Sequence, residues 1–367
     1  MDMQFICHIN LKNNDLNFKE FEVHEYSYNS KLKRVSINSP QKTNFSTNIL
    51  RISYATARTI CSYHADQQEF YFDVISSFFS HLNFIKTNPI GTNDFLLRKD
   101  RLNRLRDFSQ KTRIGELAQG VNYLFLQERL NYPFIIDYHL FCNKMKLSVS
   151  GQSPDYVILN SNLKTIGLFE SKGEAAKKSN VNGKLQSAFN QLYNAQNVLL
   201  HKNGVPVNKL IPICSKFEFN QGKISSINYC FNSLRNRKSV FNRVDIYKRH
   251  YASWFYLVGD FTRATLLNNG EVISPLETEG DISYNYETQT EIYWVSNFPF
   301  RQIANYFNLK IDVLYFDSVG FKIGISKKFV HLLINTNIEE IPIQEAVIEG
   351  NMQWFRDGTV IQINAQE

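Results

Sequence analysis

Residues 153–172 have the sequence SPDYVILNSNLKTIGLFESK. Two apolar runs, YVIL and IGLF, stand on either side of a polar stretch at residues 160–162. Short apolar runs bounded by turn-forming residues predict two strands joined by a turn. Asp155 precedes the first run and Glu170 follows the second. If the strands pair antiparallel, the two carboxylates should meet.

Carboxylates beside buried apolar side chains are costly unless they are paired or bind a cation. Mg²⁺ takes one or two protein carboxylates together with water and phosphate. Lys172 lies two residues after Glu170, so the strand period of two points both side chains to one face. A lysine there can orient a water nucleophile and stabilise charge on a phosphate. Ser171 points the other way, and its backbone carbonyl is a further candidate metal ligand.

The flanking sequence predicts the elements around these strands. Apolar residues at helical spacing predict a helix over residues 114–130 and another over residues 184–200. Apolar runs predict strands at residues 133–142, 153–160, 164–172 and 210–214. The order helix, strand, strand, strand, helix, strand predicts an α/β (α+β) fold with a mixed central sheet flanked by helices.

Ser153-Pro154-Asp155 followed by Glu170-Ser171-Lys172 resembles the signature of the PD-(D/E)XK nucleases, which include restriction endonucleases, Holliday-junction resolvases and many defence and repair nucleases. Each half of the signature occurs once in the chain. The resemblance covers roughly residues 114–215 and implies a restriction-endonuclease-like core. It also implies that Asp155 and Glu170 bind Mg²⁺ or Mn²⁺ and that Lys172 assists the attacking water. Without the resemblance, a turn and a surface ion pair would explain the same residues.

The resemblance adds candidates on the two neighbouring helices. Glu116 stands where many family members carry a glutamate that helps to bind the metal, although an acid early in a helix also interacts favourably with the helix dipole. Gln186 and Gln191 stand where many members carry polar catalytic residues, and Lys184 at the start of the same helix is a candidate for contact with nucleic acid. The QxxxY pattern of RecB-related members does not occur there.

The charge of the chain fits a polyanionic partner. The net charge is +7 and the isoelectric point is about 9.0. Two basic segments, residues 95–113 and 233–250, are candidates for binding a nucleic-acid backbone, or are solvated helix faces. The candidates within them are Arg101, Arg104, Arg235, Arg237 and Lys238. Aromatic residues are abundant, with 29 Phe and 19 Tyr, and could stack on bases where they are exposed.

Other function classes lack their motifs. The five cysteines form no CxxC pair, and the chain contains no HExxH, no GxxxxGK[ST] and no GxSxG. These absences argue against a disulfide framework, a zinc cluster, a Walker-type ATP site and an α/β-hydrolase nucleophile. The first residues do not resemble a signal peptide, and no run of 18 apolar residues occurs. We therefore expect a cytoplasmic protein without a membrane partner.

These observations predict three regions. They are an N-terminal region of unknown role at residues 1–95, the nuclease core at residues 96–232, and a C-terminal α+β region at residues 233–367 that binds nucleic acid or a partner. The first hypothesis is a metal-dependent nuclease that cleaves DNA, with restriction or anti-phage defence suggested by analogy. The alternatives are a ribonuclease and a nuclease-like protein that binds nucleic acid or a partner without cutting. A homodimer and a regulatory protein partner both stay open.

Overall fold

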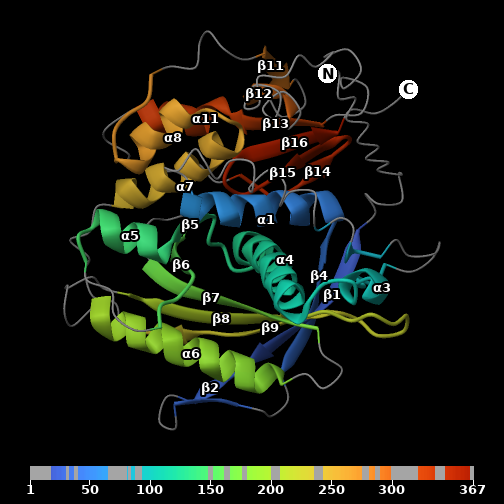
Figure 1. The fold of residues 1–367 in the computed structure, drawn as a ribbon. Coiled ribbons are helices and arrows are strands. Elements are labelled where there is room, and N and C mark those ends of the chain that lie inside the picture. Colours follow the sequence, from blue (N-terminus) through green and yellow to red (C-terminus); the bar gives the residue numbers. More distant parts are fainter. Residues whose placement is uncertain are drawn as a thin grey trace.

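The structure is a computed structural model. It describes a set of ranges that covers most of the chain, namely residues 18–29, 33–36, 40–64, 81, 84–86, 93–147, 152–160, 166–175, 180–199, 207–234, 243–274, 281–285, 290–298, 321–334 and 344–363. Within these ranges it has a mixed α/β architecture with two principal sheets and helices packed on and between them (Figure 1).

The larger sheet has eight strands and contains the candidate site. Seven strands follow the order β4-β1-β9-β8-β7-β6-β5, and β10 pairs with β8. The strands are β1 Lys19–Tyr26, β4 Gln41–Thr47, β5 Phe134–Asp137, β6 Tyr156–Leu159, β7 Ile166–Glu174, β8 Lys209–Lys216, β9 Ser226–Cys230 and β10 Asn232–Ser233. The pairs β1–β9 and β7–β8 are parallel and the others are antiparallel. The mixed sheet predicted from the sequence is thus present. It extends into the expected N-terminal region, because β1 pairs with β9.

Helices cover both faces of this sheet (Figure 1). The long helix α4, Asp107–Glu128, packs on one face, and α6, Val181–Asn197, packs on the other. Helix α1, Ile49–His64, lies against α4, and Gly120 allows the close approach because a Cβ at this position would lie 2.9 Å from the Ile52 carbonyl oxygen. None of the helices in the described ranges is long and apolar enough to cross a membrane.

Two predicted elements differ from the structure. The run at residues 133–142 is a strand only as far as Asp137, and α5, Tyr138–Lys144, follows it directly. The Asp137 side chain accepts a hydrogen bond from the Leu140 N–H at 2.8 Å and so caps this helix, which explains why the strand ends there. The spacing of Leu97, Leu102 and Leu105 is compatible with one helix over the basic segment at residues 95–113, but the four-residue α3, Lys99–Leu102, ends before α4 begins. The sequence also has apolar residues at helical spacing over residues 69–84 and a strand-like run at residues 310–316, but most of the first and all of the second lie outside the described residues.

The C-terminal part forms a second, six-stranded antiparallel sheet in the order β11-β12-β13-β16-β15-β14. Its strands are β11 Asp281–Asn285, β12 Thr290–Phe298, β13 Phe321–Ser326, β14 Ile348–Glu349, β15 Met352–Trp354 and β16 Thr359–Ile363. Three helices accompany it, namely α7 Arg243–Leu257, α8 Phe261–Asn268 and α11 Lys327–Ile334. A two-stranded hairpin, β2 Tyr28–Asn29 and β3 Arg34–Val35, completes the described strands.

A buried polar network joins the second sheet to the first. His250 Nε2 on α7 lies 2.9 Å from Asp357 Oδ2, in the turn between β15 and β16. His250 Nδ1 lies 3.1 Å from the backbone nitrogen of Ile135 on β5. Arg58 on α1 lies 3.4 Å from the same Asp357 oxygen. All three polar side chains are about 1 % exposed, so the network connects the two sheets through the interior.

Candidate active site

The pairing of β6 with β7 positions the two acidic residues. Tyr156 lies opposite Phe169 in the antiparallel register. Continuing that register by one residue places Asp155, directly before β6, opposite Glu170 on β7. The apolar residues of both strands are buried, and a slip by one residue would turn every side chain to the opposite face of the sheet, so the packing on both faces holds the register.

The two acidic residues bond to each other's strand. The backbone N–H of Asp155 donates to Glu170 Oε2 at 2.9 Å. The backbone N–H of Ser171 donates to Asp155 Oδ2 at 2.8 Å. Lys172 Nζ forms an ion pair with Glu170 Oε1. The three residues predicted from the sequence therefore meet at one point of the sheet.

Burial makes negative charge unfavourable at this point. Glu170 is 2 % exposed, and Asp155 is half-buried. Burial raises the pKa of Glu170, and the nearby charge of Asp155 raises it further, against the opposing effect of Lys172. Burial also raises the pKa of Asp155, while the Ser171 N–H and Lys172 oppose the rise. Two desolvated carboxylates with one nearby ammonium group, which contacts Glu170, leave negative charge that a further cation would stabilise.

The composition of the pair fits a hard divalent cation. No group of three or more His, Cys, Asp or Glu side chains in the described part of the chain is arranged to hold a metal. Two carboxylates are nonetheless the number that Mg²⁺ often takes from a protein, with water and phosphate completing the octahedron. Asp155 and Glu170 could hold such an ion in this way.

Lys172 and Ser171 point to opposite faces of β7. Ser171 Oγ accepts a hydrogen bond from Asn122 Nδ2 on α4 at 2.8 Å, so its side chain lies on the α4 face. Lys172 lies opposite Cys214 in the β7–β8 register, and Cys214 packs with Leu185 of α6. The Lys172 side chain is 26 % exposed. An ammonium group at the edge of solvent could reach both Glu170 and an incoming phosphate.

The candidates on α6 separate into two groups. Gln191 Nε2 lies 3.5 Å from the Ser153 carbonyl oxygen, so this residue faces the turn that carries Asp155. Gln186 instead donates to the Lys33 carbonyl oxygen and accepts from the Val35 N–H, each at 3.0 Å. Its contacts hold the β2–β3 hairpin, away from the carboxylates. Lys184 is exposed on the first turns of α6.

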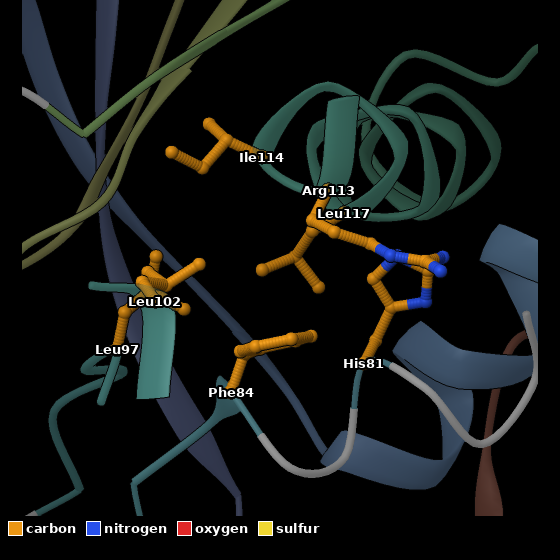
Figure 2. A pocket seen from close by; sticks show the side chains of 7 residues that line it. All are labelled: His81, Phe84, Leu97, Leu102, Arg113, Ile114 and Leu117. Atoms are coloured by element: carbon orange, nitrogen blue, oxygen red, sulfur yellow. The ribbon is translucent and has the colours of Figure 1, made fainter. Parts of the chain in front are cut away.

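Glu116 is not brought to the two carboxylates. It lies on α4, the helix on the opposite face from the Lys172 side chain. Glu116 Oε2 contacts His81 Nε2 at 3.1 Å and Arg113 Nη1 at 2.9 Å. Burial would raise the pKa of Glu116, but His81 and Arg113 outweigh burial and lower it. His81 and Arg113 also line a small pocket, together with Phe84, Leu97, Leu102, Ile114 and Leu117 (Figure 2).

Two of the basic candidates lie in α3 and the turn after it, and the other three lie outside the described residues. Arg101 and Arg104 are exposed in and just after α3. Arg101 Nε lies 3.9 Å from Asp100. Arg235, Arg237 and Lys238 fall among residues 235–242, which lie outside the described ranges.

One acidic residue near the site was not singled out from the sequence. Asp137, at the end of β5, lies opposite Tyr156, and its charge raises the pKa of Asp155. The neighbouring Tyr138 N–H donates to the Asp155 carbonyl oxygen at 3.0 Å. Asp137 shares the signal that identified the other two acids, because it also ends an apolar run, PFII.

Replacing Glu170 by glutamine should stabilise the metal-free protein at neutral pH. The raised pKa means that Glu170 binds a proton more tightly in the folded state than in the unfolded chain. Proton binding therefore stabilises the folded state at low pH, and this contribution is lost as the pH rises above the range in which a free glutamate titrates. Glutamine stays neutral at every pH and does not lose it. The free energy of unfolding should rise by on the order of 1 kcal/mol at pH 7.5, and the difference between the two proteins should vanish near pH 4. Urea unfolding of both proteins at the two pH values measures it. Glu174→Gln, at the half-exposed end of β7, is the control, and an equal gain there would contradict the assignment.

No protein-family model, no curated protein and no solved structure matches this chain.

Proposed function

We propose that this chain is a nuclease that hydrolyses phosphodiester bonds in DNA with Mg²⁺ or Mn²⁺. The observation that carries the proposal is that Asp155, Glu170 and Lys172 lie together where β6 and β7 pair. Asp155 and Glu170 accept hydrogen bonds from each other's strand, and Lys172 is ion-paired with Glu170. A purely structural ion pair would need one acid and one base, whereas here a second, half-buried acid adds negative charge that the single lysine does not balance.

The order of the surrounding elements supports a restriction-endonuclease-like core. Helix α4 precedes three antiparallel strands, β5, β6 and β7, and α6 connects β7 to β8. This is the order of helices and strands on which the resemblance to PD-(D/E)XK nucleases rests. The short helix α5 is an insertion between the first two strands.

Asp155 and Glu170 would hold the ion, and the Ser171 backbone carbonyl is the third ligand that we propose. When bound, Mg²⁺ or Mn²⁺ would lower the pKa of a coordinated water and neutralise charge on the phosphate. The buried face of β7 would keep bulk water away from Glu170. Electrostatic interactions of the buried Glu170 are stronger than the same interactions in water, because the effective dielectric constant inside a protein is lower.

Lys172 would act on the nucleophile and the phosphate. Its ammonium group is a donor of three hydrogen bonds on a flexible stem. In the structure it contacts Glu170, which positions it beside the proposed reaction centre. From there it can orient the attacking water and stabilise the charge that develops on the phosphate oxygens. Gln191, bonded to the turn before Asp155, would steady that turn.

The test is cleavage of a panel of nucleic acids by the full chain. Supercoiled plasmid, linear duplex, single-stranded DNA and RNA are incubated with Mn²⁺, with Mg²⁺ and with EDTA, beside the Lys172→Ala variant. We expect cleavage of DNA by the wild type with metal and none by the variant. Equal cleavage by both proteins would point to a contaminating nuclease and would reject the proposal. Cleavage of RNA alone would show that the chain is a ribonuclease. Metal-independent binding without cleavage of any substrate would identify a protein that binds and does not cut.

A further inference from the structure

An exposed basic segment covers α3, the turn that follows it and the start of α4. Residues 98–111, here called the basic arm, contain six cations and two acids. Five of the cations are exposed, namely Lys99, Arg101, Arg104, Arg106 and Lys111. Arg98, the sixth, pairs with Asp100 at 3.1 Å. The excess of unburied positive charge suits a polyanion.

Phe108 stands in the middle of the basic arm with its ring in solvent. It is 81 % exposed, more than any other large hydrophobic residue in the described ranges. Burial of a phenylalanine side chain stabilises a fold, and this fold leaves that gain unused. A single exposed phenylalanine is ordinary on a protein surface, but one that closely follows the exposed Arg104 and Arg106 in the chain matches the combination of aromatic and basic residues that binds unpaired bases.

The basic arm lies within reach of the candidate active site. Asn122 of α4 contacts Ser171, and a Cβ on Gly173 would lie 2.6 Å from the Ile114 carbonyl oxygen. The N-terminal half of α4 therefore lies over the C-terminal part of β7, on the face opposite to the Lys172 side chain, and Phe108 lies between one and two helical turns farther along α4. Six helical residues and three strand residues separate Phe108 from Glu170 along this path, which is roughly 20 Å. About six nucleotides of a stacked strand cover that distance.

We propose that the basic arm holds a single-stranded stretch of the substrate, with the Phe108 ring stacked on one of its bases. In a duplex both faces of each internal base are covered by neighbours, so an aromatic side chain can stack there only after unstacking a step. An unpaired base offers its face without that cost. The inference rests on the proposed function and narrows its substrate to nucleic acid with a single-stranded region, such as a flap, a fork or a free strand.

Binding without metal tests the inference separately from catalysis. Anisotropy of labelled (dT)₁₂ and of a blunt duplex is measured in EDTA for the wild type, Phe108→Ala and Phe108→Leu. We expect both variants to bind (dT)₁₂ about tenfold more weakly than the wild type and to bind the duplex with unchanged affinity. Leucine keeps the apolar surface but loses the π face, so equal losses in the two variants would show that stacking is what matters. Arg104→Ala should weaken the binding of both ligands. For the single strand it should also reduce the slope of log K against log salt concentration by about 0.7. Unchanged (dT)₁₂ affinity in both Phe108 variants overturns the inference.

A tryptophan introduced in place of Phe108 reports the stacking directly. The three native tryptophans, Trp254, Trp294 and Trp354, are all buried, so in Phe108→Trp the new indole is the exposed one. Its quenching by acrylamide should fall when (dT)₁₂ is added. The control is Phe231→Trp, because Phe231 is also exposed, at 41 %. Phe231 lies beside Lys209 at the start of β8, whereas the part of β7 near α4 pairs with the other end of β8. Its quenching should not change.

The outcomes separate this inference from the nuclease. Phe108-dependent binding of (dT)₁₂ without metal-dependent cleavage supports the inference and rejects the nuclease. Cleavage that depends on Lys172, with (dT)₁₂ binding unaffected by both Phe108 variants, rejects the inference and leaves the nuclease standing. In the Phe108→Trp variant, protection of the introduced indole that grows with protein concentration in the absence of DNA would show that a second copy covers this position, and would overturn the inference.

Discussion

Lys172→Ala should lower the rate of DNA cleavage by about 10³-fold or more while leaving divalent metal binding intact, because the variant loses a charge aimed at the phosphate and keeps both carboxylates. Asp155→Asn should abolish cleavage for a different reason, since it removes a metal ligand. Single-turnover cleavage measures the rate, and calorimetric titration with Mn²⁺ measures the metal affinity. The two variants together divide the site into a metal-binding part and a catalytic part.

The same titration gives a pH dependence. The pKa of Glu170 and that of Asp155 are raised in the metal-free protein, and the ion must displace the protons that they retain. Mn²⁺ should therefore bind more weakly as the pH falls from 8 toward 6, with release of protons to the buffer. If Asp155→Asn binds Mn²⁺ as tightly as the wild type at every pH, the two carboxylates are not the metal site.

Arg58→Ala should be the most destabilising of the substitutions considered, at about 3–5 kcal/mol. The Arg58 guanidinium is about 1 % exposed, and it donates to the Tyr54 hydroxyl at 3.1 Å and to the His250 carbonyl oxygen at 3.2 Å. Loss of the Arg58 side chain leaves the buried Asp357 carboxylate with less positive charge nearby and opens a cavity between α1 and α7. Urea unfolding followed by circular dichroism measures the change. Arg98→Ala, at an exposed ion pair with Asp100, is the control and should leave the midpoint unchanged.

The network around Asp357 also predicts sensitivity to acid. Burial alone would raise the pKa of Asp357, but the hydrogen bond from His250 and the charge of Arg58 hold it well below the usual range. The resulting stabilisation is fully present above the pKa of about 3.9 in an unfolded chain, and it is lost as the pH falls below that value. Asp357→Asn should be less stable at pH 7 and should lose less of its remaining stability between pH 5 and pH 3. An unchanged stability at pH 7 would show that the network does not hold the two sheets together.

Much of the core could be predicted from the sequence because its signals are local. The runs before and after residues 160–162 are short, apolar and bounded by polar residues, and they form β6 and β7. Helical spacing placed α6 and the second half of α4. Where two local signals competed, the prediction failed. The run at residues 133–142 is mostly apolar on both sides of Asp137, and only the capping contact of Asp137 shows that the strand ends and a helix begins there.

Contacts between distant residues could not be predicted in this way. The pairing of β1 with β9 joins residues about 200 positions apart, and no local pattern encodes a partner at that distance. The same is true of Glu116, which lies on the helix expected from its sequence but contacts His81 and Arg113. Gln186 likewise lies on the predicted helix, and it faces the β2–β3 hairpin because its rotation on the helix directs it there.

The sequence by itself determined which side chains could do chemistry and that Glu170 and Lys172 share a face, because strand periodicity and the position of an acid beside an apolar run are properties of neighbouring residues. Only the tertiary structure decided that Asp155 lies opposite Glu170, that Asp137 lies beside them, and that Glu116 lies elsewhere. The physical reason is that charge and burial act through space. The energy of a carboxylate depends on what surrounds it after folding, and residues far away in the chain supply those surroundings.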